Sequence, residues 1–92
     1  NQNNVDTEGA GLVVYTGSTA VNITGYRAPS ADGDILLILV TGSATITHQN
    51  QNAGSDVGNR MVFQGAADLG VATNRALMLT YRDSRWREMK WA

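Results

Sequence analysis

The chain has 92 residues and no cysteine, and its seven Lys or Arg and eight Asp or Glu leave a formal net charge of −1. This composition excludes a disulfide framework or a thiolate metal site, and it offers no basic excess for nucleic-acid binding. The longest apolar run falls far short of the roughly 20 residues that a membrane-spanning helix needs, so we expect no membrane insertion.

Ten glycines, a single proline and few helix-forming residues are typical of short strands joined by tight turns. A chain of this length forms one domain with a modest core, so its stability is marginal unless another surface adds to that core. The chain begins with Asn and lacks a charged-then-apolar secretion signal, so we interpret it as a fragment or processed piece of a longer protein.

The first part of the chain is polar. Residues 1–11 are rich in Asn and Gly, and we expect a linker or loosely held lead-in there, followed by a single β domain over residues 12–92. Residues 12–16 and 20–25 are the first two strand candidates, and a glycine-containing turn separates them. The second candidate alternates apolar and polar side chains, which is typical of a strand with one face in water.

Residues 34–40 form the most apolar stretch, Asp-Ile-Leu-Leu-Ile-Leu-Val. A strand directs alternate side chains to opposite sides, so Leu36 and Ile38 share one face while Leu37 and Leu39 share the other. Because neither face is suited to water, both must be covered, by a second layer of the same chain or by a partner chain. Leu36, Leu37, Ile38 and Leu39 are therefore predicted to lie in the core or in an oligomer contact.

The remaining strand candidates follow at similar spacing. The turn at residues 41–43 is short enough to favour a hairpin between residues 34–40 and 44–49, and residues 82–84 favour a second hairpin. No internal repeat at a fixed period is found. The later strand candidates are residues 59–64, 75–81 and 85–91, and residues 69–72 form a short strand or a bend. By propensity the C-terminal stretch could instead be a short helix, but the turn before it and its two tryptophans favour a strand. Seven or eight strands at spacings of about 8–12 residues predict an all-β fold, a small antiparallel, jelly-roll-like β-sandwich.

The search for catalytic chemistry is mostly negative. His48 is the only histidine, so one chain cannot form a histidine cluster. We expect an imidazole at a strand end that hydrogen-bonds to a loop; the alternative is that three chains place His48 on a threefold axis, where it binds an anion or a metal ion. The acidic residues lie mostly in turns, and Asp32-Gly33-Asp34 lacks the further ligands of a calcium loop. No catalytic residue, metal or cofactor is predicted.

The polar loop after His48 is a candidate binding rim. Many lectin-like surfaces hold sugar rings between amides and exposed aromatic side chains, although a small β domain needs most of its aromatics for its core. Four consecutive amide side chains form the candidate glycan-contacting rim: Gln49, Asn50, Gln51 and Asn52. The alternative is a solvated loop without a ligand.

Three short motifs occur in a characteristic order between about residues 26 and 91. They are Asp32-Gly-Asp-Ile-Leu-Leu-Ile-Leu39, Ile46-Thr-His48 followed by Asn59-Arg60, and Leu79-Thr-Tyr81 followed by Arg85-Trp86-Arg87. This order resembles a β domain found towards the C-terminal ends of bacteriophage tail fibres, tailspikes and related virion appendage proteins. The structural motif residues of the resemblance are His48, Asn59, Arg60, Tyr81, Arg85 and Trp86.

The resemblance implies a non-enzymatic, homotrimeric virion protein that helps an extracellular appendage to fold, to trimerise or to bind a glycan or protein of the host surface. It implies that Arg60 ties loop carbonyls or Asp56 to the sheet, and that Trp86 closes one end of the core with Tyr81 beside it. Two alternatives remain open: a phage head-decoration or other capsid-associated structural protein, and a carbohydrate-binding module of a secreted enzyme.

Overall fold

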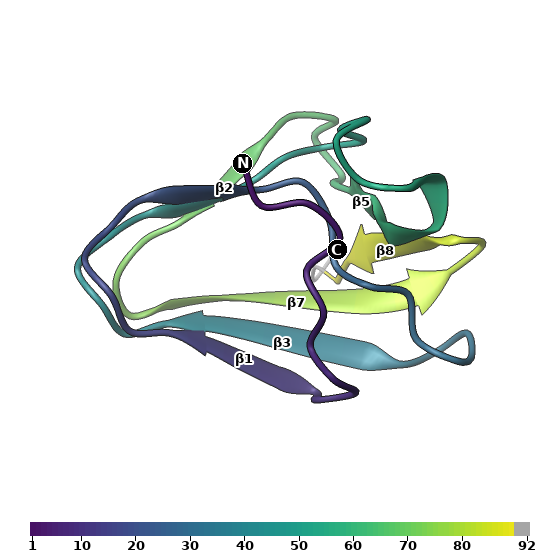
Figure 1. The fold of residues 1–92 in the computed structure, drawn as a ribbon, viewed down its shortest axis with the longest axis horizontal. Coiled ribbons are helices and arrows are strands. Elements are labelled where there is room, and N and C mark those ends of the chain that lie inside the picture. Colours follow the sequence, from purple (N-terminus) through teal and green to yellow (C-terminus); the bar gives the residue numbers. More distant parts are fainter. Residues whose placement is uncertain (90–92) are drawn as a thin grey trace.

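The computed structural model describes residues 1–89, which form two β-sheets packed face to face (Figure 1). The strands are β1 (Leu12–Tyr15), β2 (Val21–Ile23), β3 (Ile35–Val40), β4 (Ile46–His48), β5 (Met61–Val62), β6 (Leu69–Val71), β7 (Arg75–Arg82) and β8 (Arg85–Glu88), and one 3₁₀ turn, η1 (Val57–Asn59), precedes β5. The all-β prediction is confirmed for these residues. Within them, no helix has the length and apolar character needed to cross a bilayer. Residues 90–91 of the strand predicted at 85–91 lie outside the described residues.

Both sheets are mixed rather than antiparallel. The larger sheet has the strand order β1-β3-β7-β8-β5, and the smaller has the order β2-β4-β6. The pairs β1–β3, β2–β4 and β5–β8 are parallel, whereas β3–β7, β4–β6 and β7–β8 are antiparallel. The predicted antiparallel, jelly-roll-like arrangement is therefore wrong. The physical reason is that the chain crosses to the opposite sheet after β1 and again after β3. The two strands that precede these crossings, β1 and β3, therefore run in the same direction, and so do the two that follow them, β2 and β4.

The hairpin predicted between β3 and β4 does not form, while the hairpin of β7 and β8 does. The amides of Thr41 and Gly42 both donate to the Tyr15 carbonyl, at 3.0 and 3.1 Å, and not back to β3. Residues 41–45 thus form a corner between the two sheets. In contrast, Asp83 and Ser84 adopt positive φ values of 52° and 60°, the backbone geometry of a tight hairpin turn.

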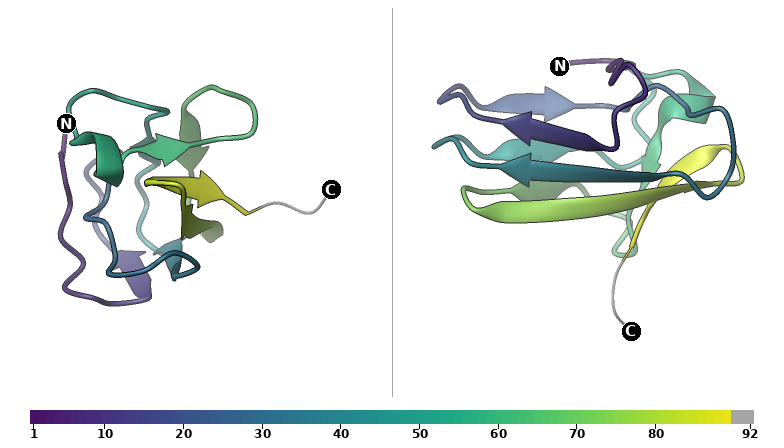
Figure 2. Two further views of the ribbon diagram at one scale, coloured as in Figure 1. Left: turned by 90° about the vertical axis from the view of Figure 1, so that its right-hand side faces the viewer. Right: turned by 90° about the horizontal axis from the view of Figure 1, so that it is seen from below.

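Two segments of the chain repeat each other in the fold. Leu12 lies opposite Leu37 in one sheet and Val21 lies opposite Ile46 in the other, so both sheets pair residues that are 25 positions apart. We call residues 12–23 the first arch and residues 37–48 the second arch, because each is a strand, a corner and a strand. Their corners, Thr16-Gly-Ser18 and Thr41-Gly-Ser43, are identical and lie on the same side of the molecule in Figure 2. The expectation of no internal repeat is therefore wrong.

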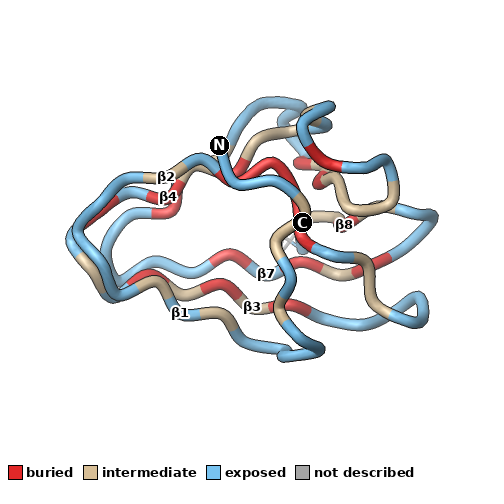
Figure 3. Tube along the Cα trace, viewed as in Figure 1, coloured by how far each residue is buried: buried red, intermediate tan, exposed pale blue. Residues whose placement is uncertain are grey.

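The core lies between the sheets, and buried positions occur along strands of both layers (Figure 3). Leu36 and Ile38 are 1 % and 0 % exposed, so both lie in this core. At one end of this core the Trp86 ring packs edge-on against Tyr81, with ring centroids 5.2 Å apart. The indole Nε1 donates to the Tyr26 carbonyl at 3.0 Å, which satisfies the polar atom that burial would otherwise leave unpaired.

Residues 1–5, expected as part of a linker or lead-in, lie along the free edge of β2. Gln2 and Val5 form parallel bridges with Ile23 and Tyr26. The segment is also fixed by polar contacts, since the Asn4 amide donates to Ser55 Oγ at 2.8 Å. The first residues of the chain thus extend the smaller sheet.

Candidate functional site

The outward face of the larger sheet carries a continuous set of apolar side chains. Alternation along each strand turns these residues away from the core, and the registers place Leu12, Leu37 and Met78 in one row across three strands. Met89 continues that row, because its amide donates to the Met78 carbonyl. We call this set the outer apolar face: Leu12, Val14, Ile35, Leu37, Leu39, Ala76, Met78 and Met89.

Much of the outer apolar face is open to water. Leu12 and Ile35 are 50 % and 51 % exposed, and Val14, Met78 and Met89 are at least 40 % exposed. Together these residues expose apolar surface on the order of 500 Å², which is near the upper end for the largest patch on a monomeric protein and is often functional. The two faces predicted for residues 34–40 thus differ: one chain buries Leu36 and Ile38 but leaves Leu37 and Leu39 only partly covered.

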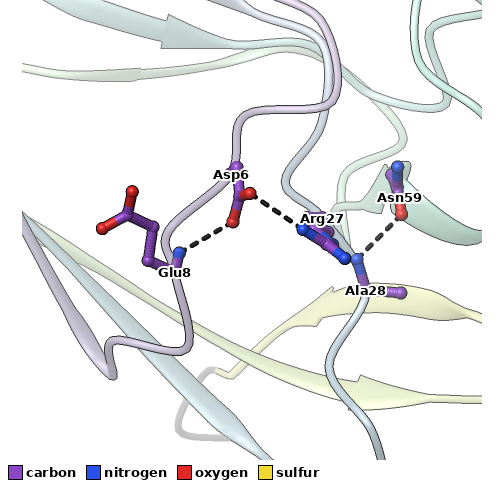
Figure 4. Close-up of polar contacts among 5 residues, drawn as sticks. All are labelled: Asp6, Glu8, Arg27, Ala28 and Asn59. Carbon is purple, nitrogen blue, oxygen red and sulfur yellow. Dashed lines mark hydrogen bonds and ion pairs between the residues drawn. The ribbon is translucent and has the colours of Figure 1, made fainter.

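A polar cleft of about 750 Å³ lies between the N-terminal segment and the loop after β2. Asp6 accepts hydrogen bonds from Arg27 Nη1 at 2.9 Å and from the Glu8 amide at 2.8 Å (Figure 4). The Glu8 amide, followed by Arg27, holds the pKa of Asp6 below its ordinary value, so this carboxylate stays ionised at neutral pH. Asp34, Ile35 and the largely buried Trp86 also line the cleft, and Ile35 belongs to the outer apolar face as well, so the two surfaces adjoin. Carboxylates beside a guanidinium are suited to hydrogen-bonding hydroxyl-rich ligands.

The loop on the far side of the cleft is held by Asn59. Asn59 Oδ1 accepts from the Ala28 amide and Asn59 Nδ2 donates to Asn4 Oδ1, each at 2.8 Å (Figure 4 shows the first). One side chain therefore joins the N-terminal segment, the loop after β2 and η1. Arg60 acts next to it: Arg60 Nε donates to the Ser55 carbonyl at 3.0 Å, the loop-carbonyl contact that the resemblance implies.

His48 lies at the end of β4 and is fully buried within one chain. Its Nε2 is 2.7 Å from the Tyr26 hydroxyl, which is in turn 3.1 Å from the Tyr15 hydroxyl. Burial lowers the pKa of His48 to about 4 and raises the pKa of Tyr26, so both side chains are neutral at pH 7. The strand-end imidazole is thus as expected. The threefold-axis alternative is wrong, because a side chain enclosed in its own core cannot meet two symmetry mates.

The four amides of the predicted rim are largely engaged in holding their own loop. Asn52 Nδ2 donates to Gln49 Oε1, and Asn50 Oδ1 accepts from the Phe63 amide at 2.8 Å. Gln51 is exposed, with its Oε1 bound by Arg85 Nε at 2.9 Å. The structure therefore places Gln51 nearest to the solvent and uses the other three to shape the loop. None of the four lines the polar cleft.

The sequence interpretation missed the cleft and anticipated only the β3 part of the outer apolar face. Asp6 and Arg27 are 21 residues apart and meet only because residues 1–5 pair with β2. The outer apolar face was predicted in part, through β3, but its neighbours on β1 and β7 could be added only once strand order was known. The identical Thr-Gly-Ser corners were a usable signal in the sequence for the pairing of β1 with β3.

The described residues contain no group of three or more His, Cys, Asp or Glu side chains that could hold a metal ion. The described residues thus present one exposed apolar sheet face and one cleft lined by an ion pair. Comparison with known proteins found no match to this chain among protein-family models, curated proteins or solved structures.

Proposed function

We propose that this chain is a non-enzymatic domain of a bacteriophage tail fibre or tailspike, which forms a homotrimer and attaches the virion to a glycan of the host surface. The observation that carries the proposal is the outer apolar face of the larger sheet. The order of the Asp-Gly strand, His48, Asn59-Arg60 and Trp86 motifs supports the choice of protein class.

The outer apolar face supports association by its size. Burial of about 500 Å² per chain contributes on the order of 12 kcal/mol before association costs, which are themselves about 4–15 kcal/mol. A stable interface buries about 800 Å² per partner, so the apolar area supplies a centre and the surrounding polar residues supply the rim. Arg82, Arg85 and Arg87 lie on the same outward side of β7 and β8 and belong to that rim. In a trimer, each chain would direct this sheet face towards the threefold axis.

Glycan binding is assigned to the polar cleft. Its volume is within the 300–1,000 Å³ typical of small-ligand sites, and its Asp6–Arg27 pair is accessible, with side chains 49 % and 68 % exposed. Sugar hydroxyls both donate and accept hydrogen bonds, so a carboxylate and a guanidinium held side by side match adjacent hydroxyls. Gln51 remains a candidate for a secondary contact.

Sedimentation velocity on the purified chain tests the association step. We expect a trimer at tens of micromolar, and we expect Leu12→Asp and Met78→Asp to give folded monomers, because both side chains are exposed within one chain. Val57→Asp is the matched control: Val57 is also 50 % exposed, but it lies on η1, away from the outer apolar face. A wild-type monomer over this concentration range would overturn the trimer.

A glycan array tests the attachment step. Binding by the trimer supports the host-attachment role. A trimer that binds no glycan points to a capsid-associated structural protein instead, and a monomer that binds polysaccharide points to a carbohydrate-binding module.

A further inference from the structure

The stacking of the two arches explains why the second corner has a glycine at position 42. A Cβ on Gly42 would lie 2.1 Å from the Gly17 carbonyl oxygen and 2.5 Å from the Thr16 carbonyl carbon. Both are backbone atoms of the first arch, which cannot move aside as a flexible side chain could. Gly42 is therefore required because the first corner lies directly against the second.

Gly17 holds the same place in the first arch, but no neighbouring backbone requires a glycine there. A Cβ on Gly17 would meet no atom of residues 1–89 within 4 Å, and its φ is not in the left-handed region. The first corner thus already has, at Gly17, the glycine that would be needed if a further corner stacked against it.

The strand leading to that corner is also uncovered. Among the strands that the structure describes, β1 is an edge strand and its only neighbour is β3. The carbonyls of Gly11 and Tyr15 accept hydrogen bonds from the amides of Leu37 and Thr41 in the second arch. Because successive residues of a strand direct their backbone groups to opposite sides, the amides and carbonyls of Leu12 and Val14 point to the free edge. Exposed edges of this kind are sites where another strand can pair.

The other half of the first arch is already covered. Residues 2–5 run parallel to β2 on its outer edge, which is the position that the second strand of a third arch would take. The Gln2 amide donates to the Asn22 carbonyl, so the backbone at Asn1 points back along β2 towards the corner at Gly17.

We infer that the free edge of β1 and the corner at Gly17 accept a third arch of the same build, which leads into Asn1. This arch has an apolar strand parallel to β1, a small-residue corner over Gly17 and residues 2–5 as its second strand. The inference does not depend on the proposed function, because it rests only on the register of the arches and on the two glycines.

The test is a chain extended at its N-terminus by a copy of residues 12–21, fused directly to Asn1. This length places the last residue of the copy opposite Val21 and the first opposite Leu12. We expect a rise in Tm of about 5 °C or more. We also expect the Leu12 and Val14 amides, measured by NMR hydrogen exchange, to become at least about tenfold more protected, since they gain hydrogen-bond partners.

Two controls make the test specific. The same ten residues in scrambled order should leave the exchange of Leu12 and Val14 unchanged. Gly17→Ala should have little effect on the original chain but should abolish the gain in the extended chain, whereas Gly42→Ala should lower the Tm of both. Exchange at Leu12 and Val14 that is as fast with the copied arch as without it, or protection that survives Gly17→Ala, would overturn the inference.

Discussion

The two faces of β3 have almost the same side chains and very different surroundings. Leu36 and Ile38 face the smaller sheet and are almost completely buried, whereas Ile35 on the opposite face is 51 % exposed and Leu37 is only partly covered. Three strands, β2, β4 and β6, cover the inner face, and nothing in the described chain covers the outer one. Hydrophobicity therefore indicates that both faces favour burial, and topology decides which of them a single chain can bury.

The largest expected effect is a loss of folding when a charge is placed on the inner face of β3 but not on its outer face. Ile38→Asp places an unpaired carboxylate in the core, at a cost of several kcal/mol, and should abolish folding as measured by circular dichroism. Leu37→Asp should remain folded but lose self-association in sedimentation experiments. If Leu37→Asp also unfolds the chain, or if Ile38→Asp remains folded, the distinction between a core face and an association face is wrong.

The second effect, of intermediate size, is a pH dependence of stability that comes from His48 in the core between the sheets. The pKa of His48 is about 4 in the folded chain and 6.5 in the unfolded chain, so the unfolded state binds the proton more readily between these values. The free energy of unfolding should therefore fall as the pH is lowered from 6.5 to 4, by about 3 kcal/mol in total.

Urea unfolding at a series of pH values measures this dependence. Most carboxylates titrate below pH 5, so the upper part of the window belongs to His48. His48→Gln should be less stable but should have a nearly flat profile between pH 6.5 and 5. An equally steep profile in that variant would show that another group carries the effect.

The smallest effect on stability is expected in the polar cleft, which is accessible to solvent. Arg27→Ala removes an exposed ion pair and should leave the Tm unchanged. It should weaken glycan binding about tenfold or more, because a hydrogen bond to a charged group is worth about 1.5–3 kcal/mol. Arg75→Ala is the matched control, because Arg75 begins β7 and is not part of the cleft lining. This variant should bind glycan as the wild type does. Equal binding by both variants would remove Arg27 from the site.

The positions of the strands were predictable because strand formation here follows local rules. Apolar alternation and glycine-containing turns placed seven of the eight strands and left β6 open as a strand or a bend, and Asp83-Ser84 favoured the hairpin that forms. The turn at residues 41–43 is equally short and was also expected to close a hairpin, yet it forms a corner. Its amides bind Tyr15, which lies 26 and 27 residues earlier, and no rule that acts over a few residues can detect that partner.

The candidate sites were harder to predict than the strands. Leu37 and Leu39 were expected at a core or oligomer contact, but Leu12, Val14 and Met78 join them only through strand order. Asp6 was assigned to a lead-in segment, since nothing in its neighbourhood indicates that residues 2–5 pair with β2. The amides at 49–52 were visible in the sequence, but their engagement within their own loop was not.

The amino-acid pattern alone is enough to identify a β protein with a strand too apolar for water on either face, and it contains the repeated Thr-Gly-Ser corner. The folded chain was needed to show that this corner joins two sheets, that the strands on either side of it pair residues 25 positions apart, and that one apolar face is left uncovered among the described residues. Side-chain alternation is set by neighbouring residues, whereas strand pairing and burial depend on backbone groups and surfaces brought together from distant parts of the chain.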